Sequence, residues 1–256
     1  MLGFLKYEIP YSIDDPQRTI WHKKIILEKP FLKKLYLDWY NTFINAVPNL
    51  PKNGILLEIG SGGGFLKDVL PQVTTSDILP LESIDYTFSA LDIPFENNSV
   101  RAIFLVDTFH HIPDAKKFLS EVSRVLKKDG QLIMIEPCNS IWGRFIYKNF
   151  HHEPFEENEG WSFKQSGPLS GANIALPWIV FQRDYKQYNE YFPNLKIKSI
   201  QYHTPIKYIL SGGVSMKALV PNFTYSFFNG LEKVMNPISK WFSMHMTITI
   251  TKVSDI

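Results

Sequence analysis

The chain has 256 residues, of which 45% are hydrophobic and 14% aromatic, so it can bury the core of one enzyme-sized domain with some elaboration. Its formal net charge of +2 predicts no polyanionic partner such as nucleic acid, and its single cysteine, Cys138, excludes an internal disulfide. No stretch approaches the roughly 18 consecutive apolar residues of a membrane span, and Lys6 and Glu8 do not fit a signal peptide. We therefore expect a cytoplasmic protein without a transmembrane segment.

The first predicted element is a helix over about residues 30–47. Apolar side chains recur there at four-residue intervals and form one face: Phe31, Leu35, Trp39, Phe43 and Val47. Pro30 suits the first turn of such a helix, and Pro48 ends it. We expect residues 1–50 to form a helical cover before the main domain.

Strands and helices then alternate. Short apolar runs predict strands at 55–59, 72–76, 85–88, 102–106 and 131–135. Between the last two, apolar residues repeat at helical spacing, with Asp114 as a suitable N-cap and Gly130 just past the expected end. This alternation is typical of a parallel sheet with helices on both faces.

The last part of the chain has a different pattern. Residues 195–202 and 245–252 alternate apolar and polar side chains, as half-exposed strands do. Two aromatic, glycine-punctuated insertions, 139–184 and 205–244, interrupt the succession of strands. We find no internal repeat and no low-complexity tract.

The segment 55–64, Ile-Leu-Leu-Glu-Ile-Gly-Ser-Gly-Gly-Gly, is a short strand that runs into a glycine-rich turn. A turn without Cβ atoms lets the backbone approach a ligand closely, and Asp77, at the end of the next strand, is placed to accept hydrogen bonds from ribose hydroxyls. A nicotinamide or flavin site requires Gly-x-Gly-x-x-Gly, which fails here because Phe65 occupies the third position. An ordinary strand-to-helix turn is the structural alternative.

This segment together with Asp77 resembles the first two motifs of class I S-adenosylmethionine-dependent methyltransferases, whose glycine pattern is acidic-x-Gly-x-Gly-x-Gly. Residues 92–100 are similar to the Leu-Pro-Phe segment before the fourth strand of these enzymes, and residues 106–114 resemble the strand end that follows. The resemblance, which covers about 54–137, implies S-adenosyl-L-methionine as cofactor. It also implies a doubly wound, Rossmann-like sheet of seven mostly parallel strands with an antiparallel edge hairpin.

The resemblance divides the chain, as one domain, into a cover at 1–50, a cofactor-binding core at 51–138, a cap insertion at 139–194 and an edge hairpin at 195–256 with a helical insertion at 205–244. The cofactor-binding residues that it implies are Glu58, Gly60, Ser61, Gly62, Gly64, Asp77, Ser89, Ala90, Val106 and Asp107. Ser89 departs from the pattern, because an Asp usually accepts the adenine amino group there. A hydroxyl accepts that bond more weakly, and Asp92, the nearest acid, lies three residues further on.

The candidate catalytic residues are His110, His111, His152 and Glu153, with Glu136 as a pocket-lining candidate. A base is needed only if the acceptor is protonated near neutral pH. The alternatives are structural histidines at 110–111 and a solvated loop at 151–153. We expect no metal, because consecutive residues such as 151–153 point in different directions and no spaced His-x-x-His is present.

The 205–244 insertion combines lysines with aromatic residues and contains one acid, Glu232. Such a segment can contact anionic lipid or form a lid over the domain. We favour the lid over peripheral membrane contact, because Pro221 and Pro237 break the segment.

The chain as a whole looks like a group of bacterial methyltransferases loosely associated with sugar and cell-envelope biosynthesis. Shared short segments are Lys-Pro-Phe-Leu, His-His-Glu-Pro-Phe and Leu-Ser-Gly-Gly-Val-Ser. The resemblance implies methyl transfer to a hydroxyl or carboxyl of a small molecule, sugar or lipid-linked glycan. A natural-product methyltransferase and a cofactor-binding protein without turnover are the alternatives. The sequence predicts neither the acceptor nor the oligomeric state.

Overall fold

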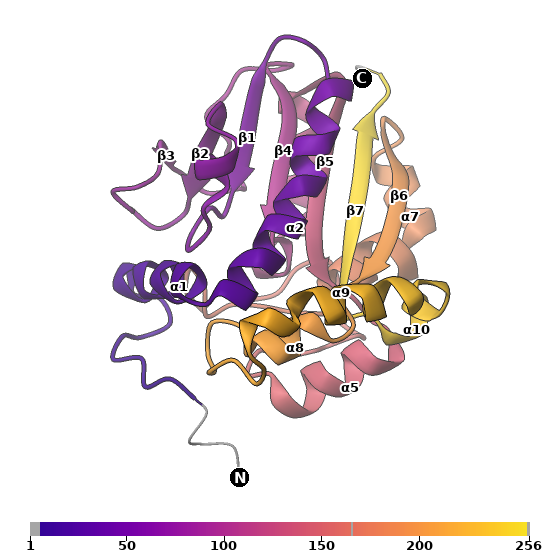
Figure 1. The fold of residues 1–256 in the computed structure, drawn as a ribbon. Coiled ribbons are helices and arrows are strands. Elements are labelled where there is room, and N and C mark those ends of the chain that lie inside the picture. The colour runs from indigo at the N-terminus through magenta and orange to yellow at the C-terminus, as the bar shows by residue number, and fades with distance from the viewer. Residues whose placement is uncertain (1–5, 165, 255–256) are drawn as a thin grey trace.

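The computed structural model describes residues 6–164 and 166–254; residues 1–5 of the expected cover, residue 165 of the expected cap and residues 255–256 of the expected hairpin lie outside the described residues. Its centre is a seven-stranded sheet with the order β3-β2-β1-β4-β5-β7-β6 (Figure 1). The strands are β1 (Ile55–Ile59), β2 (Val73–Asp77), β3 (Tyr86–Thr87), β4 (Val100–Val106), β5 (Leu126–Pro137), β6 (Leu195–His203) and β7 (His245–Lys252). Neighbouring strands are parallel except for β7, which is antiparallel to both β5 and β6. The expected fold class is confirmed.

Helices cover both faces of the sheet and the end at which its parallel strands finish (Figure 1). They are α1 (Pro16–Glu28), α2 (Pro30–Ala46), α3 (Leu66–Val69), α4 (Ala115–Val125), α5 (Ile141–Phe150), α6 (Leu176–Trp178), α7 (Tyr185–Tyr191), α8 (Lys207–Ser211), α9 (Tyr225–Val234) and α10 (Ser239–Phe242). No helix within 6–164 or 166–254 is long and apolar enough to cross a membrane.

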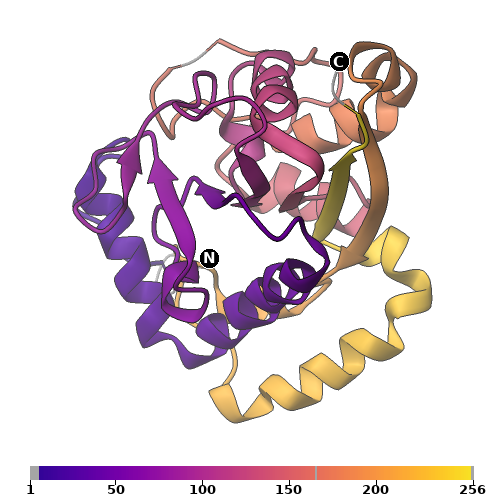
Figure 2. The ribbon, with the colours of Figure 1, turned by 90° about the horizontal axis from the view of Figure 1, so that it is seen from above.

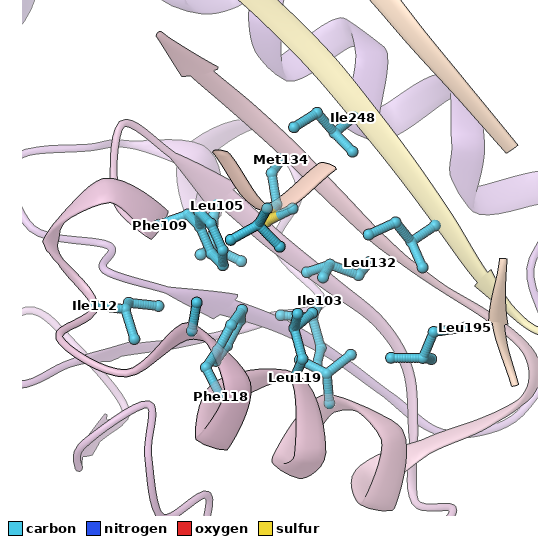
Figure 3. Packing of buried hydrophobic residues seen from close by; sticks show 14 of the residues in the cluster. Ile103, Leu105, Phe109, Ile112, Phe118, Leu119, Leu132, Met134, Leu195 and Ile248 are labelled. Atoms are coloured by element: carbon cyan, nitrogen blue, oxygen red, sulfur yellow. The ribbon is translucent and has the colours of Figure 1, made fainter. Parts of the chain in front are cut away.

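Each face of the sheet has its own hydrophobic core. On one face, α4 packs Phe118, Leu119 and Val122 against buried side chains of β4, β5 and β7 (Figure 3). On the other face, α2 buries the predicted stripe that includes Leu35 and Phe43. Because both faces of β4 are covered, its near-continuous apolar run is the pattern expected of a parallel strand.

Several boundaries differ from the sequence-based prediction. α4 is capped by Asp114 as predicted, but it ends at Val125, so Gly130 lies inside β5, which begins at Leu126. β3 is only two residues long. β7 lies between β5 and β6 and is mostly buried rather than half-exposed, so β6 is the edge strand on this side of the sheet.

The helix α1 lies within the expected helical cover, but no helix was predicted at its own residues. Its start carries a recognisable signal, because Asp15 caps it by accepting the Gln17 N–H (2.8 Å) and Pro16 occupies its first turn. Its apolar residues form no strong stripe, since only Thr19, Ile25 and Ile26 are buried. The spacing of its apolar residues therefore did not predict a helix at these residues.

Candidate active site

A cavity of about 550 Å³ lies at the carboxyl ends of β1, β2 and β4. This is the edge at which doubly wound sheets bind ligands. The loops after these strands form its floor, while α1, α2, the 151–153 segment and the loop after α8 contribute to its walls.

The cavity brings together all the predicted cofactor-binding and catalytic residues, whereas Glu136, the predicted pocket-lining residue, is not part of its lining. Its lining contains the implied cofactor contacts: Glu58, Gly60, Ser61, Gly62, Gly64, Asp77, Ser89, Ala90, Val106 and Asp107. It also contains the candidate catalytic residues: His110, His111, His152 and Glu153. Their placement around one cavity is observed, whereas their roles stay predictions.

The glycine turn after β1 has no room for side chains. Gly60 has φ +72°, and a Cβ there would lie 2.4 Å from the side chain of Thr108. Gly62 has φ +37°, and its N–H donates to Asp77 Oδ2 (2.9 Å). A Cβ on Gly64 would lie 2.8 Å from the Tyr40 hydroxyl. The turn is therefore a backbone-lined cradle with a carboxylate beside it, which fits a nucleoside that carries an amino-acid group.

Two buried carboxylates flank this cradle. Asp77 accepts the Gly62 N–H through Oδ2 and the Leu79 N–H through Oδ1 (2.9 Å), so its side chain is held at the cavity wall. Burial raises the pKa of Asp77. Burial also raises the pKa of Glu58 to about 7, and the nearby Asp77 acts in the same direction. A positively charged ligand group would stabilise both carboxylates in their ionised forms.

Ser89, which stands where the resembled pattern has an Asp, lines the cavity with Ala90. Its hydroxyl accepts the Leu91 N–H (3.2 Å) and so closes a local turn. Asp92 is not among the cavity-lining residues, so it does not replace the missing acid.

Glu153 lies at the centre of a cluster of imidazoles that lines the same cavity. Its carboxylate oxygens lie 3.4 Å from His110 Nε2, 3.5 Å from His111 Nε2, and 3.7 Å from both His151 Nδ1 and His152 Nε2. The two sequence motifs at 110–111 and 151–153, which are far apart in the chain, therefore form one site.

Glu136, at the end of β5, fixes the first of these histidines. Its Oε2 lies 2.8 Å from His110 Nδ1, while its Oε1 accepts the N–H groups of Thr108 (2.8 Å) and Phe109 (2.7 Å). Glu136 is fully buried. This carboxylate is better described as an anchor of the loop after β4 than as a group that meets a substrate.

The cluster holds opposite charges next to one another. Burial alone would lower the pKa of His110, but its hydrogen bonds to Glu136 and Glu153 outweigh burial and raise it to about 10. Burial would raise the pKa of Glu153, but the hydrogen bond and the charge of His110 hold it well below its usual range. At neutral pH, His110 is therefore a cation between two carboxylates.

His111 is in the opposite state. Burial and the neighbouring His110 charge lower its pKa, so the ring is neutral near pH 7. Its Nδ1 lies 3.1 Å from the carbonyl oxygen of Gly171. Because a carbonyl only accepts, Nδ1 carries the proton and Nε2 keeps a lone pair.

The same residues are those that would hold a metal ion. The ligand atoms of His110, His111 and Glu153 lie within 4.8 Å of one another, as do those of His151, His152 and Glu153. Neighbouring side chains at 151–153 do diverge, but the first set combines residues from two segments of the chain. The expected absence of a metal stays a prediction.

Sequence analysis missed His245, which lines the cavity and lies 3.3 Å from Asp107 through Nε2. Within the described part of the chain, neither His245 Nδ1 nor Asp107 Oδ1 has a hydrogen-bond partner. His245 begins β7, which is antiparallel, so its amino end lies where the parallel strands finish, opposite Pro137. The resemblance implies an antiparallel edge hairpin, and this strand direction was the signal that could have placed His245 at the cavity.

Comparisons with known proteins indicate a methyltransferase. Residues 57–134 match a family model described as "Methyltransferase domain". The chain is similar to a ubiquinone/menaquinone biosynthesis C-methyltransferase of Rickettsia bellii, with 30% identity over a region that covers 38% of this chain and 49% of the relative. It is also similar to a demethylmenaquinone methyltransferase of Bacillus licheniformis, with 25% identity and coverages of 50% and 52%. The chain spans about half the length of these curated relatives.

Among solved structures, the chain is similar to a geranyl diphosphate C-methyltransferase from Streptomyces coelicolor A3(2), in complex with Mg²⁺, geranyl diphosphate and S-adenosyl-L-homocysteine. The TM-score is 0.51 at 14% identity, and the alignment covers 97% of this chain and 91% of that one. At this identity, the likeness establishes the shared fold.

Proposed function

We propose that the whole chain transfers a methyl group from S-adenosyl-L-methionine to a small-molecule acceptor, because residues 57–134 match the model of a methyltransferase domain. The observation that supports the proposal is that one cavity is lined by both the glycine cradle and the Glu153 cluster. Donor and acceptor bound at these two places would meet inside one enclosure.

The glycine cradle suits the cofactor. In this proposal, the backbone of Gly60, Gly62 and Gly64 lies against its amino-acid portion, Asp77 accepts bonds from the ribose, and Ser89 with Ala90 contacts adenine. When bound, the cofactor supplies a methyl group already activated on a positively charged sulfur. The chain therefore has to position the reactants and exclude water.

The Glu153 cluster suits the acceptor. The neutral His111, with its lone pair on Nε2, is the side chain that can take a proton from the acceptor. His110 and Glu153 hold a fixed pair of opposite charges beside it. His152 is the most exposed of these histidines, and we assign it to the mouth of the acceptor site.

The names of two similar proteins suggest the kind of acceptor. One is a C-methyltransferase of ubiquinone/menaquinone biosynthesis, and the other is a geranyl diphosphate C-methyltransferase. These names favour a small, largely apolar acceptor over the sugar or glycan preferred from sequence. We infer that the nucleophile is an acceptor oxygen, or an electron-rich carbon conjugated with it, because one base can activate either by removing the oxygen-bound proton. A lipid-linked glycan and a natural product are the alternatives.

The test is formation of S-adenosyl-L-homocysteine from S-adenosyl-L-methionine when a bacterial lipid extract is added to the purified chain. We expect formation with the extract and only a trace without it. Calorimetry should also show that S-adenosyl-L-homocysteine binds and that NAD does not. Binding without product, over every fraction of the extract, would identify a cofactor-binding protein without turnover.

A further inference from the structure

The segment 223–242, which contains α9 and α10, exposes a series of large apolar side chains. Its large side chains recur at intervals of three or four residues and are all exposed, among them Phe223 (83%), Val234 (77%) and Phe227 (68%). We call the full set the outer stripe: Phe223, Phe227, Leu231, Val234, Ile238 and Trp241. Within α9 this spacing places Phe227, Leu231 and Val234 on one face, while Phe223 lies just before this helix and Ile238 and Trp241 follow it.

The opposite face of α9 is already used. Tyr225 is buried against Phe31, and Glu232 Oε1 accepts the N–H groups of Ile206 (2.9 Å) and Lys207 (2.7 Å). Lys207 Nζ also donates to Asn229 Oδ1 (2.8 Å). These contacts fix which way the helix faces, so the outer stripe is not the packing face of a lid. Figure 2 shows α9 and α10 as an arm at the periphery of the molecule.

The helix α5 extends the same apolar surface. Its exposed side chains include Ile141 (64%), Phe145 and Phe150, while Tyr147 on its other face is buried and lines the cavity. Ser140, the N-cap of α5, donates its hydroxyl hydrogen bond to the carbonyl of Ser243, directly after α10. Figure 1 shows α5, α8, α9 and α10 gathered below the carboxyl ends of the parallel strands.

Within the segment 217–242, the exposed charged side chains are all lysines. Lys217, Lys233 and Lys240 are exposed, and the single acid between residues 217 and 242 is Glu232, which faces Lys207 (3.4 Å). An apolar face bordered by lysines is the pattern of a helix that lies in the interface of an anionic bilayer. Two copies of the same face would bring their lysines together, which disfavours a homodimer through this surface.

We propose that the outer stripe and the exposed face of α5 dock the chain onto a membrane containing anionic lipid. The apolar side chains enter the interface and the lysines meet the lipid headgroups. This replaces our sequence-based preference for a lid.

The docking surface is joined to the cavity by shared helices. Tyr147 of α5 and Tyr208 of α8 line the cavity, as do Val214 and Ser215 in the loop that leads to α9. A docked chain therefore presents its acceptor site beside the bilayer, and the acceptor is an amphiphile dissolved in that bilayer. This identification of the acceptor rests on the proposed methyl transfer, whereas the docking does not.

The test is co-sedimentation with vesicles made of equal parts phosphatidylcholine and phosphatidylglycerol. We expect the wild-type chain to sediment with them and to bind neutral phosphatidylcholine vesicles much less. Phe227→Ser with Trp241→Ser should lower the partition coefficient by about tenfold or more. The matched control is Val253→Ser, which removes an exposed apolar side chain at the end of β7, away from this surface.

A second pair of variants tests the charges. Lys233→Glu with Lys240→Glu should lower binding to the anionic vesicles severalfold, while Lys128→Glu with Lys198→Glu, which changes two exposed lysines elsewhere, should not. The proposal is overturned if the Phe227/Trp241 variant binds like wild type. It is also overturned if the chain without lipid is a dimer that the same substitutions dissociate.

Calorimetry with S-adenosyl-L-homocysteine on each variant separates the two proposals. Lost docking with unchanged cofactor affinity supports the membrane surface independently of turnover. Retained docking in a chain that never forms methylated product would refute the proposed function and leave the docking intact.

Discussion

Asp77 is the residue on which the cofactor assignment depends most, because it both supports the glycine turn and faces the cavity. We expect Asp77→Ala to weaken S-adenosyl-L-homocysteine binding by roughly 1 to 3 kcal/mol, since it removes charge-assisted hydrogen bonds to the ribose. Asp77→Asn keeps an oxygen acceptor and should lose less. Asp92→Ala, outside the cavity lining, is the control. Equal affinities for wild type and Asp77→Ala in calorimetry would remove Asp77 from the site.

Glu58 gives a pH signature. Burial raises its pKa to about 7, so a large fraction of the molecules carries a protonated Glu58 at neutral pH when no ligand is bound. A cationic ligand favours the ionised form, so binding of S-adenosyl-L-methionine should release a proton and become severalfold tighter between roughly pH 6 and 8. The Glu58→Gln variant should lose this dependence. Identical pH profiles for the two proteins would contradict the prediction.

His110 affects stability rather than binding. Its folded-state pKa, about 10, lies above the roughly 6.5 of an unfolded histidine, so its stabilising contribution is complete below about pH 6.5 and is lost as pH rises through 10. We expect His110→Gln to lower the free energy of unfolding by roughly 3 to 5 kcal/mol at about pH 6, because it leaves two buried carboxylates without their cation. Denaturant titrations at several pH values measure this. A loss that grows toward alkaline pH has the wrong sign for this account.

At the scale of elements, the turn after β1 is limited by space. Gly60→Ala would place a Cβ 2.4 Å from Thr108 at a φ of +72°. We expect it to lower the free energy of unfolding by roughly 1 to 3 kcal/mol, measured by denaturant titration. Gly160→Ala is the matched control, because its Cβ would meet nothing within 4 Å, and it should change stability by about 0.5 kcal/mol or less. Similar losses in both variants would mean that the turn is not sterically constrained.

The elements that sequence predicted well are those with strong local patterns. The helix α2 and the strands β1 and β4 follow from a continuous apolar stripe or run. The buried position of β7 could not be read locally, because its alternating Thr and Ile residues look half-exposed and only the pairing with β5 and β6 covers the second face. Pairing between distant strands is a tertiary property that overrides local pattern.

The candidate site likewise combines residues that a local motif predicts and residues that only the tertiary structure brings together. The glycine turn and Asp77 lie within one local motif, so sequence placed both at the cavity. The contact between His110 and Glu153 depends on how the cap insertion folds back over β4, and no spacing in the sequence encodes that. The outward direction of the stripe on α9 was equally hidden, because it is set by the contacts of Glu232 and Lys207 on the inner face.

At the scale of the whole molecule, the central claim is that one cavity holds the cofactor at the glycine cradle and the acceptor at the Glu153 cluster. Substitutions in the Glu153 cluster should then separate binding from turnover. The decisive measurement compares the wild-type chain with His111→Phe and Glu153→Gln in two assays: calorimetry with S-adenosyl-L-homocysteine, and incorporation of labelled methyl groups into the lipid extract. We predict affinities within about 1 kcal/mol of wild type and incorporation lowered by about 10²-fold or more. Full incorporation in both variants would contradict the claim.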